Sequence, residues 1–147
     1  MATPASEPKV AFDTNILVYA MNVKAEHHEA CSALRDRVLR RELSACVSVQ
    51  VLFEYFAVVT NPNYMTVPLP AEDALADLEA YAQVLEVLQT PEDIASRVVA
   101  LMRASGFSGR SIFDVQIAAT LLANGVFQIY TYDQRFEKIT GVTVLSP

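Results

Sequence analysis

Four acidic residues stand where a soluble domain seldom places a carboxylate: Asp13, Glu54, Asp114 and Asp133. The first three interrupt apolar segments at residues 10–20, 51–59 and 112–119, and the fourth follows an apolar segment that ends at residue 130. Carboxylates that lie close together repel one another unless a cation binds between them. Oxygen donors without paired Cys or His favour a hard cation, Mg²⁺ or Mn²⁺, and such a site suits phosphoryl chemistry.

Each of these acids has a simpler structural explanation when it is taken alone. Asp13 could cap the helix that follows it, and Asp133 could cap the short turn that comes after it. Asp114 lies three residues after Ser111 and could complete a capping box. Glu54 could reach the end of its helix or pair with an arginine. These alternatives stay open for each residue until the elements that carry the acids are considered together.

The hydrophobic pattern and the turn residues predict an alternation of strands and helices. Strands are expected at residues 9–12, 43–47, 85–88, 126–130 and 142–145. Helices are expected at residues 15–21, 25–41, 49–60, 71–83, 91–104 and 112–123, with a helical turn at 134–138. Thr14 or Asn15, Ser48 and Ser111 are the expected N-caps of three of these helices. This alternation predicts an α/β fold with a central parallel sheet of about five strands and helices on both faces.

That topology brings the four acids to one edge of the sheet. In a right-handed parallel sheet, the carboxyl ends of the strands and the N-termini of the following helices lie at the same edge. Asp13 and Asp133 leave strands at this edge, Asp114 is in the first turn of its helix, and Glu54 is in the second turn of a helix that follows a strand. We therefore expect the four carboxylates to converge on one crevice and to bind a metal ion there.

Length and composition indicate one globular domain. The chain has 147 residues, which is enough for one full hydrophobic core. We expect a flexible tail at residues 1–8 and a single domain at residues 9–147. No uncharged apolar run is long enough to predict a membrane span. Two cysteines without ligand-like spacing predict no disulfide framework, and a cytoplasmic location fits them best.

The charge balance bears on the substrate. The net charge is −6, which argues against general coating of nucleic acid, although local arginines and a bound cation can still permit cleavage. Arg110 lies four residues before Asp114 and is a candidate phosphate contact, or else a plain surface arginine. The arginines of residues 35–41 form a solvated face, or a surface for RNA or an acidic partner. The apolar content of 52% predicts an apolar surface used for association.

Several short motifs together resemble one known family. Residues 12–15 (FDTN), the mid-helix Glu54, residues 113–114 with the apolar stretch 117–120, and residues 131–133 (TYD) are similar to the motifs of PIN-domain nucleases, and most of all to the VapC-type toxins of toxin–antitoxin modules. The resemblance implies a three-layer α/β/α fold, metal-dependent endoribonuclease activity, a homodimer, and a cognate antitoxin that holds the enzyme inactive. Matched position by position, the acidic quartet is Asp13, Glu54, Asp114 and Asp133, with Asn15 and Thr131 as supporting polar residues.

The leading hypothesis is therefore a ribonuclease that cleaves RNA with a metal-activated water. One alternative is a PIN-like module that binds protein or RNA without catalysis. A second is a phosphatase that takes phosphate on Asp13, but such enzymes usually carry another Asp two residues later, where this chain has Asn15. His27 and His28 are adjacent on the predicted helix and point to different sides, so we expect them to be solvated rather than metal ligands.

Overall fold

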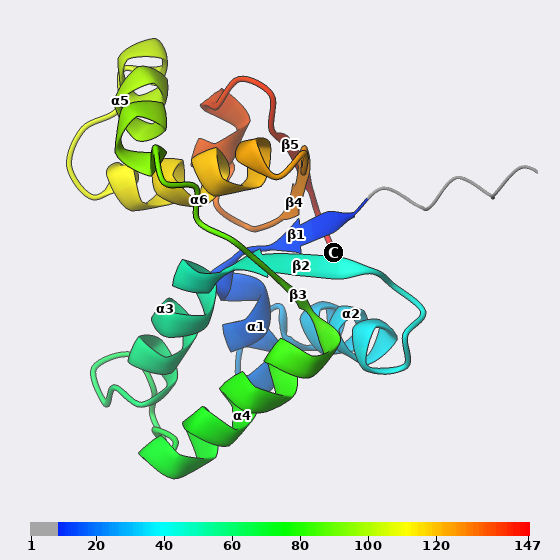
Figure 1. The fold of residues 1–147 in the computed structure, drawn as a ribbon. Coiled ribbons are helices and arrows are strands. Elements are labelled where there is room, and N and C mark those ends of the chain that lie inside the picture. Colours follow the sequence, from blue (N-terminus) through cyan, green and yellow to red (C-terminus); the bar gives the residue numbers. More distant parts are fainter. Residues whose placement is uncertain (1–8) are drawn as a thin grey trace, which may run out of the picture.

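The computed structural model describes residues 9–147, which form one five-stranded sheet and its covering helices (Figure 1). The strands are β1 (Val10–Phe12), β2 (Ala45–Ser48), β3 (Glu86–Leu88), β4 (Gln128–Tyr130) and β5 (Thr143–Leu145). The helices are α1 (Thr14–Met21), α2 (His28–Leu39), α3 (Val49–Val59), α4 (Ala71–Val84), α5 (Ile94–Ser105) and α6 (Ser111–Ala123), followed by the 3-10 helix η1 (Gln134–Lys138).

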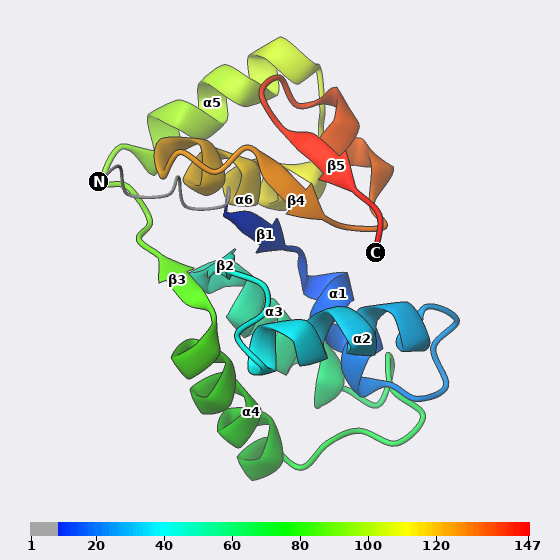
Figure 2. The ribbon, with the colours of Figure 1, turned by 90° about the vertical axis from the view of Figure 1, so that its right-hand side faces the viewer.

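The sheet is parallel throughout and has the strand order β3-β2-β1-β4-β5. Helices α1 to α4 lie on one side of it, and α5 and α6 lie on the other (Figure 2). Every residue of β1 and β2 is buried, as expected for strands covered on both faces. The prediction of an α/β fold with a central parallel sheet of five strands and helices on both faces is confirmed.

The core explains why β1 is the centre of the fold. Ala11 pairs with Cys46 of β2 on one side and with Ile129 of β4 on the other, and all three side chains are fully buried. Apolar residues of α1 and of α6, among them Leu17 and Leu121, are also fully buried in the same core. Because β1 lies between two strands and two helix layers, the residue that ends it is held firmly in place.

The helix caps differ from those predicted. The N-cap of α1 is Asp13, and Thr14 is already helical, because the Asp13 carboxylate accepts the hydrogen bond from the Thr14 N–H at 2.7 Å. Ser48 stands at the N-cap position of α3 but makes no capping hydrogen bond. Ser111 is the first residue of α6 rather than its cap, and its hydroxyl donates to the Ser108 carbonyl at 2.6 Å. In each helix the boundary is within one residue of the prediction, but the capping chemistry is different.

The loop before α2 also differs from the prediction, which started this helix at residue 25. His27 stacks on Tyr132 with ring centroids 3.8 Å apart and an interplanar angle of 11°. His28 places Nδ1 2.8 Å from the Tyr19 carbonyl oxygen. The two histidines are therefore half-buried against Tyr132 and the end of α1 rather than solvated.

Predictions from the sequence also concern membrane spans, cysteines and the N-terminal residues. Within residues 9–147, no helix is long and apolar enough to cross a membrane. Cys31 and Cys46 are both buried and free. The predicted tail at residues 1–8 lies outside the described residues, and the division of the chain at residue 9 stays a prediction.

A partly buried hydrogen bond between α3 and α4 gives a test of this packing. The hydroxyl of Tyr55, which is fully buried, donates to Asp77 Oδ2 at 2.7 Å. Tyr55→Phe leaves that carboxylate without its donor, and we expect the free energy of unfolding in urea to fall by about 1–2 kcal/mol. Tyr64→Phe, at a side chain that is 70% exposed, is the control and should change it by less than about 0.5 kcal/mol. Equal losses in both variants would contradict the assignment.

Candidate active site

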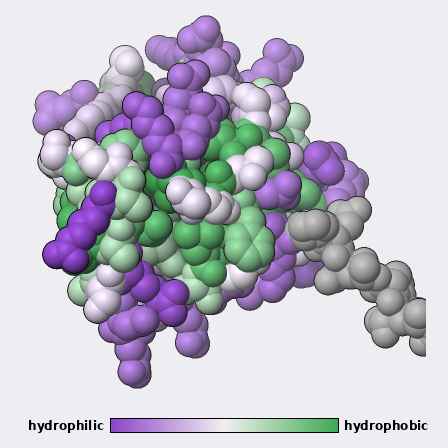
Figure 3. Space-filling model, turned by 90° about the horizontal axis from the view of Figure 1, so that it is seen from above, coloured by the Kyte–Doolittle hydropathy of each residue, from purple (hydrophilic) through white to green (hydrophobic). Residues whose placement is uncertain are grey.

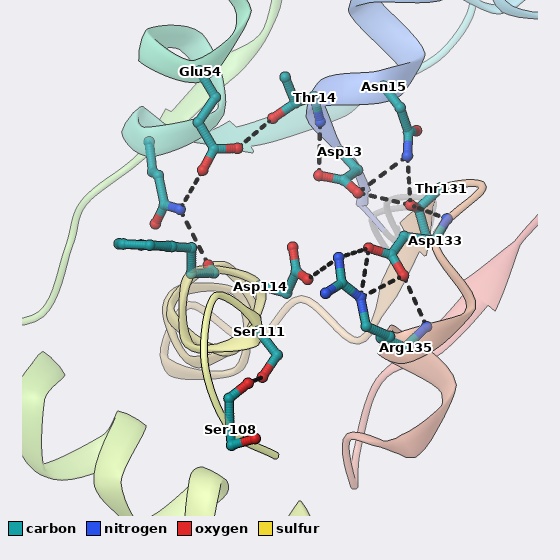
Figure 4. Close-up of polar contacts among 12 residues, drawn as sticks. Asp13, Thr14, Asn15, Glu54, Ser108, Ser111, Asp114, Thr131, Asp133 and Arg135 are labelled. Atoms are coloured by element: carbon teal, nitrogen blue, oxygen red, sulfur yellow. Dashed lines mark hydrogen bonds and ion pairs between the residues drawn. The ribbon is translucent and has the colours of Figure 1, made fainter.

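Asp13 is the most buried of the four acids. It leaves β1 at the centre of the sheet, caps α1 and is only 5% exposed. Its Oδ1 accepts from the Thr14 N–H, and its Oδ2 accepts from the Thr131 hydroxyl at 2.7 Å and from Asn15 Nδ2 at 3.4 Å (Figure 4). Asp13 therefore does cap α1, as the simpler explanation predicted, but capping uses only Oδ1. Oδ2 is bound by Thr131 and Asn15 instead.

Thr131 links the carboxyl ends of β1 and β4, two strands that are far apart in the sequence. Its hydroxyl donates to Asp13, and the same oxygen accepts from Asn15 Nδ2 at 3.2 Å and from the Asp133 N–H at 2.9 Å. Asn15 Oδ1 also accepts from the Tyr132 N–H at 3.4 Å. Asn15 and Thr131, predicted as supporting residues, thus connect the start of α1 to the turn after β4.

Glu54 reaches the site from α3, in the second turn of the helix. Its Oε2 accepts from the Thr14 hydroxyl at 2.8 Å, and its Oε1 accepts from Gln50 Nε2 at 2.7 Å (Figure 4). The Gln50 amide also donates to the Phe113 carbonyl at 3.1 Å, which ties α3 to the start of α6. Within residues 9–147, Glu54 has no ion pair with an arginine, so that alternative is wrong for the described part of the chain.

Asp114 comes from the first turn of α6 and points towards the other acids (Figure 4). Its side chain is 17% exposed, and Oδ2 is buried without a hydrogen bond from the described residues. Arg135 Nη2 lies 2.9 Å from this oxygen, so the contact is an ion pair that lacks hydrogen-bond geometry. Because Ser111 is inside the helix, Asp114 does not complete a capping box with it.

Asp133 has two roles in the structure. It caps η1 by accepting from the Arg135 N–H at 3.0 Å, as the simpler explanation predicted. It also binds the guanidinium of Arg135, with Nη2 2.6 Å from Oδ2 and Nε 3.0 Å from Oδ1. Arg135 therefore bridges Asp133, which follows β4, and Asp114, which lies in the first turn of α6.

The electrostatics follow from burial and like charges. Burial raises the pKa of Asp13 to about 6, against the hydrogen bonds from Thr131 and Thr14, and nearby Glu54 and Asp133 raise it further. Burial also raises the pKa of Asp114 to about 7, opposed by Arg135 and reinforced by the surrounding acids. The hydrogen bonds from Arg135 instead hold the pKa of Asp133 below its usual value.

An open crevice of about 390 Å³ runs beside the acids. Glu54 and Asp114 line it together with two arginines, Arg110 and Arg135. The Arg110 guanidinium lies 5.6 Å from the centre of the Phe113 ring and bonds to none of the four acids. This placement keeps Arg110 available as a phosphate contact, which stays a prediction.

The donor set fits a hard divalent cation. All four side chains offer carboxylate oxygens, and one buried oxygen of Asp114 has no hydrogen bond from the described residues. In the conformation that the structure shows for residues 9–147, however, no three Asp, Glu, His or Cys side chains lie close enough together to surround one ion. The guanidinium of Arg135 lies against two of the four acids, Asp114 and Asp133.

Two residues that shape the site were missed by the sequence reasoning. Gln50 lies one helical turn before Glu54, so its contact could have been inferred from i, i+4 spacing. Arg135 lies two residues after Asp133, which indicates proximity to that acid. Its contact with Asp114 depends on the path of η1 relative to α6, and no sequence pattern shows that path.

Comparison with known proteins decides the family. The family model of the PIN domain matches residues 10–142, which is nearly the whole chain. The chain belongs to the PIN-domain family. Among curated PIN-type relatives, ribonuclease VapC48 of Mycobacterium tuberculosis is 25% identical over 141 residues, covering 92% of this chain and 95% of the relative. Ribonuclease VapC24 of the same species is 28% identical over 124 residues, covering 83% and 84%. The chain is thus a distant homologue of the VapC ribonuclease toxins.

Solved structures show the same PIN fold. VapC20 of M. tuberculosis, described as a sarcin–ricin loop cleaving toxin, superposes with a TM-score of 0.70 at 16% identity, covering 94% of this chain and 99% of that one. VapBC2 of Rickettsia felis, solved bound to a DNA fragment from its promoter, gives a TM-score of 0.65 at 19% identity, covering 94% and 98%. At these identities the superpositions support the fold, and the site rests on the residues of this chain.

The raised pKa of Asp114 predicts a pH-dependent penalty on stability in the absence of metal. A carboxyl whose folded pKa lies above its unfolded value holds its proton longer when folded, so stability falls as pH rises from about 4 to about 7 and then levels off. In EDTA, Asp114→Asn should therefore raise the melting temperature by about 2–4 °C at pH 8, and by much less near pH 4. Scanning calorimetry at both pH values measures this difference. Glu137→Gln, on the exposed surface of η1, is the control, and a pH-independent effect of Asp114→Asn would contradict the prediction.

Proposed function

We propose that this chain is a metal-dependent endoribonuclease and the toxin of a toxin–antitoxin module. The observation that carries the proposal is the arrangement of Asp13, Glu54 and Asp114, which come from the end of β1, from α3 and from α6 and together line a second hollow that shares Glu54 and Asp114 with the crevice. A structural protein has no use for mutually repelling carboxylates at the edge of its sheet. Membership of the PIN-domain family and the VapC ribonuclease relatives support the same conclusion.

In this proposal Asp13, Glu54, Asp114 and Asp133 hold Mg²⁺ or Mn²⁺. When bound there, the cation would activate water and stabilise the charge that develops on the phosphate. The chain itself fixes the acids: Thr131 and the Thr14 N–H orient Asp13, while Gln50 orients Glu54. Arg110, on the rim of the crevice, is placed to contact a phosphate of the RNA.

Protein partners are part of the proposal. We infer that the chain binds a cognate antitoxin, because structures with the same fold include toxin–antitoxin complexes. We also propose that it forms a homodimer through an apolar surface. The face covered by α5 and α6 carries an apolar area (Figure 3). Val99, Ile112 and Phe113 line a shallow pocket there and are 40–47% exposed. Such a surface suits association with protein rather than contact with water.

Cleavage of RNA tests the activity directly. Wild-type protein with Mg²⁺ or Mn²⁺ should cut RNA of several classes, with end groups mapped to show hydrolysis, and EDTA should abolish the cut. Asp13→Asn should lower the rate at least about 100-fold, because it removes one charge from the buried donor set. Cleavage that is unaffected by EDTA or by Asp13→Asn would refute the proposal. Absence of both cleavage and metal-induced stabilisation would favour the non-catalytic binding module.

The supporting role of Thr131 has its own test. Thr131→Val keeps the shape of the side chain but removes the hydroxyl that binds Asp13, Asn15 and the Asp133 N–H. Loss of such an orienting partner should lower kcat/KM by about 10- to 100-fold. Thr120→Val is the matched control, because among residues 9–147 that buried hydroxyl bonds only to the Gln116 carbonyl within α6 and lies outside the site. Similar activities of the two variants would remove Thr131 from the site.

A further inference from the structure

Arg135 holds a position in the site that the family motifs do not explain. It lies on η1, its side chain is 51% exposed, and its guanidinium is turned inward onto two acids (Figure 4). Nη2 lies 2.6 Å from Asp133 Oδ2 and 2.9 Å from Asp114 Oδ2. Nε lies 3.0 Å from Asp133 Oδ1 and 3.1 Å from Asp133 Oδ2. A half-exposed arginine that could extend into water is instead bound by both carboxylates.

The atoms that Arg135 engages are the ones that a cation would need. One nitrogen lies between Oδ2 of Asp114 and Oδ2 of Asp133, so the guanidinium supplies positive charge where the like charges meet. The Asp114 oxygen is buried and receives no hydrogen bond from the described residues, so charge alone holds this contact. The Asp133 contact is different, since two nitrogens grip both oxygens in a fork geometry.

We propose that Arg135 is a positioning residue that holds Asp114 and Asp133 in the place of a divalent cation, so that the two cations compete for the same carboxylates. Loading of the site then requires the guanidinium to leave Asp114. This inference rests on the proposed function only in taking Mg²⁺ or Mn²⁺ as the ligand, and it concerns binding rather than cleavage. Arg135 lowers the affinity for metal while it prevents Asp114 and Asp133 from repelling each other in the metal-free protein.

The first test measures metal affinity without RNA. Metal-free full-length protein is titrated with Mn²⁺ by calorimetry, as wild type, Arg135→Gln and Arg110→Gln. Arg110→Gln removes the same charge from the same crevice without freeing a carboxylate, so it reports the change in the general field. We expect Arg135→Gln to bind Mn²⁺ about two- to fivefold more tightly than wild type, which is the scale of a partly exposed ion pair. Arg110→Gln should tighten binding clearly less.

A conservative variant separates geometry from charge. Arg135→Lys keeps the positive charge but cannot grip both oxygens of Asp133 and reach Asp114 at once. Its Mn²⁺ affinity should fall between those of wild type and Arg135→Gln. Melting curves in EDTA verify that each variant is folded. The proposal is overturned if Arg135→Gln binds Mn²⁺ no more tightly than Arg110→Gln, or if it binds more weakly than wild type.

The second test observes the guanidinium itself. The Nε–H resonance of Arg135, assigned by its absence from Arg135→Gln, is followed by NMR while Mg²⁺ is added. The Arg135 resonance should shift as Mg²⁺ binds. The Nε–H of Arg97 on α5, which donates to Asp93, should not shift. An Arg135 signal that is unchanged at saturating Mg²⁺ overturns the proposal. If Mg²⁺ moves the signal but wild type cleaves no RNA, competition stands and the proposed function fails.

Discussion

The hydrogen bond from Thr131 to Asp13 is the interaction on which the site depends. It joins the residue that follows β1 to the residue that follows β4, and both are nearly inaccessible to water. Since β1 and β4 are adjacent and parallel, the two ends lie at the same edge of the sheet. Asn15 closes the same link from α1, so hydrogen bonds connect two strand ends and the start of a helix. The acids of α3 and α6 are then placed against a rigid base.

The opposing constraint is charge. Bringing Asp13 and Asp114 out of water raises both pKa values, and their negative neighbours raise them further. Such an arrangement costs stability, which is common for residues selected for chemistry rather than for folding. Arg135 offsets part of this cost at Asp114 and Asp133, and Thr14 does so at Glu54 through a hydroxyl. The balance leaves Asp114 with a buried oxygen that lacks a hydrogen bond from the described residues.

The sequence predicts the order of the elements and the four acids, because both depend on local patterns. Alternating apolar strands and amphipathic helices leave a few right-handed parallel topologies, and all of them place the carboxyl ends of the strands at one edge. Cap identity was predicted less well: Asp13, Thr14 and Asn15 can all cap a helix, and the choice depends on where β1 stops pairing. The stacking of His27 on Tyr132 and the reach of Arg135 to Asp114 could not be predicted, since each joins segments about a hundred or about twenty residues apart through loops.

Net charge is a poor guide to what this crevice can bind. A net charge of −6 describes the whole chain, whereas an RNA phosphate would meet a small area in which Arg110 and Arg135 stand beside Glu54 and Asp114. Electrostatic forces are screened over about 8–10 Å at physiological salt, so distant acids on α4 matter little there. A divalent cation bound to the carboxylates would make the electrostatic potential of the crevice more positive. Arg110 and Arg135 would still line the same crevice. The acidic composition is therefore compatible with an RNA substrate, provided that the positive charge is delivered locally.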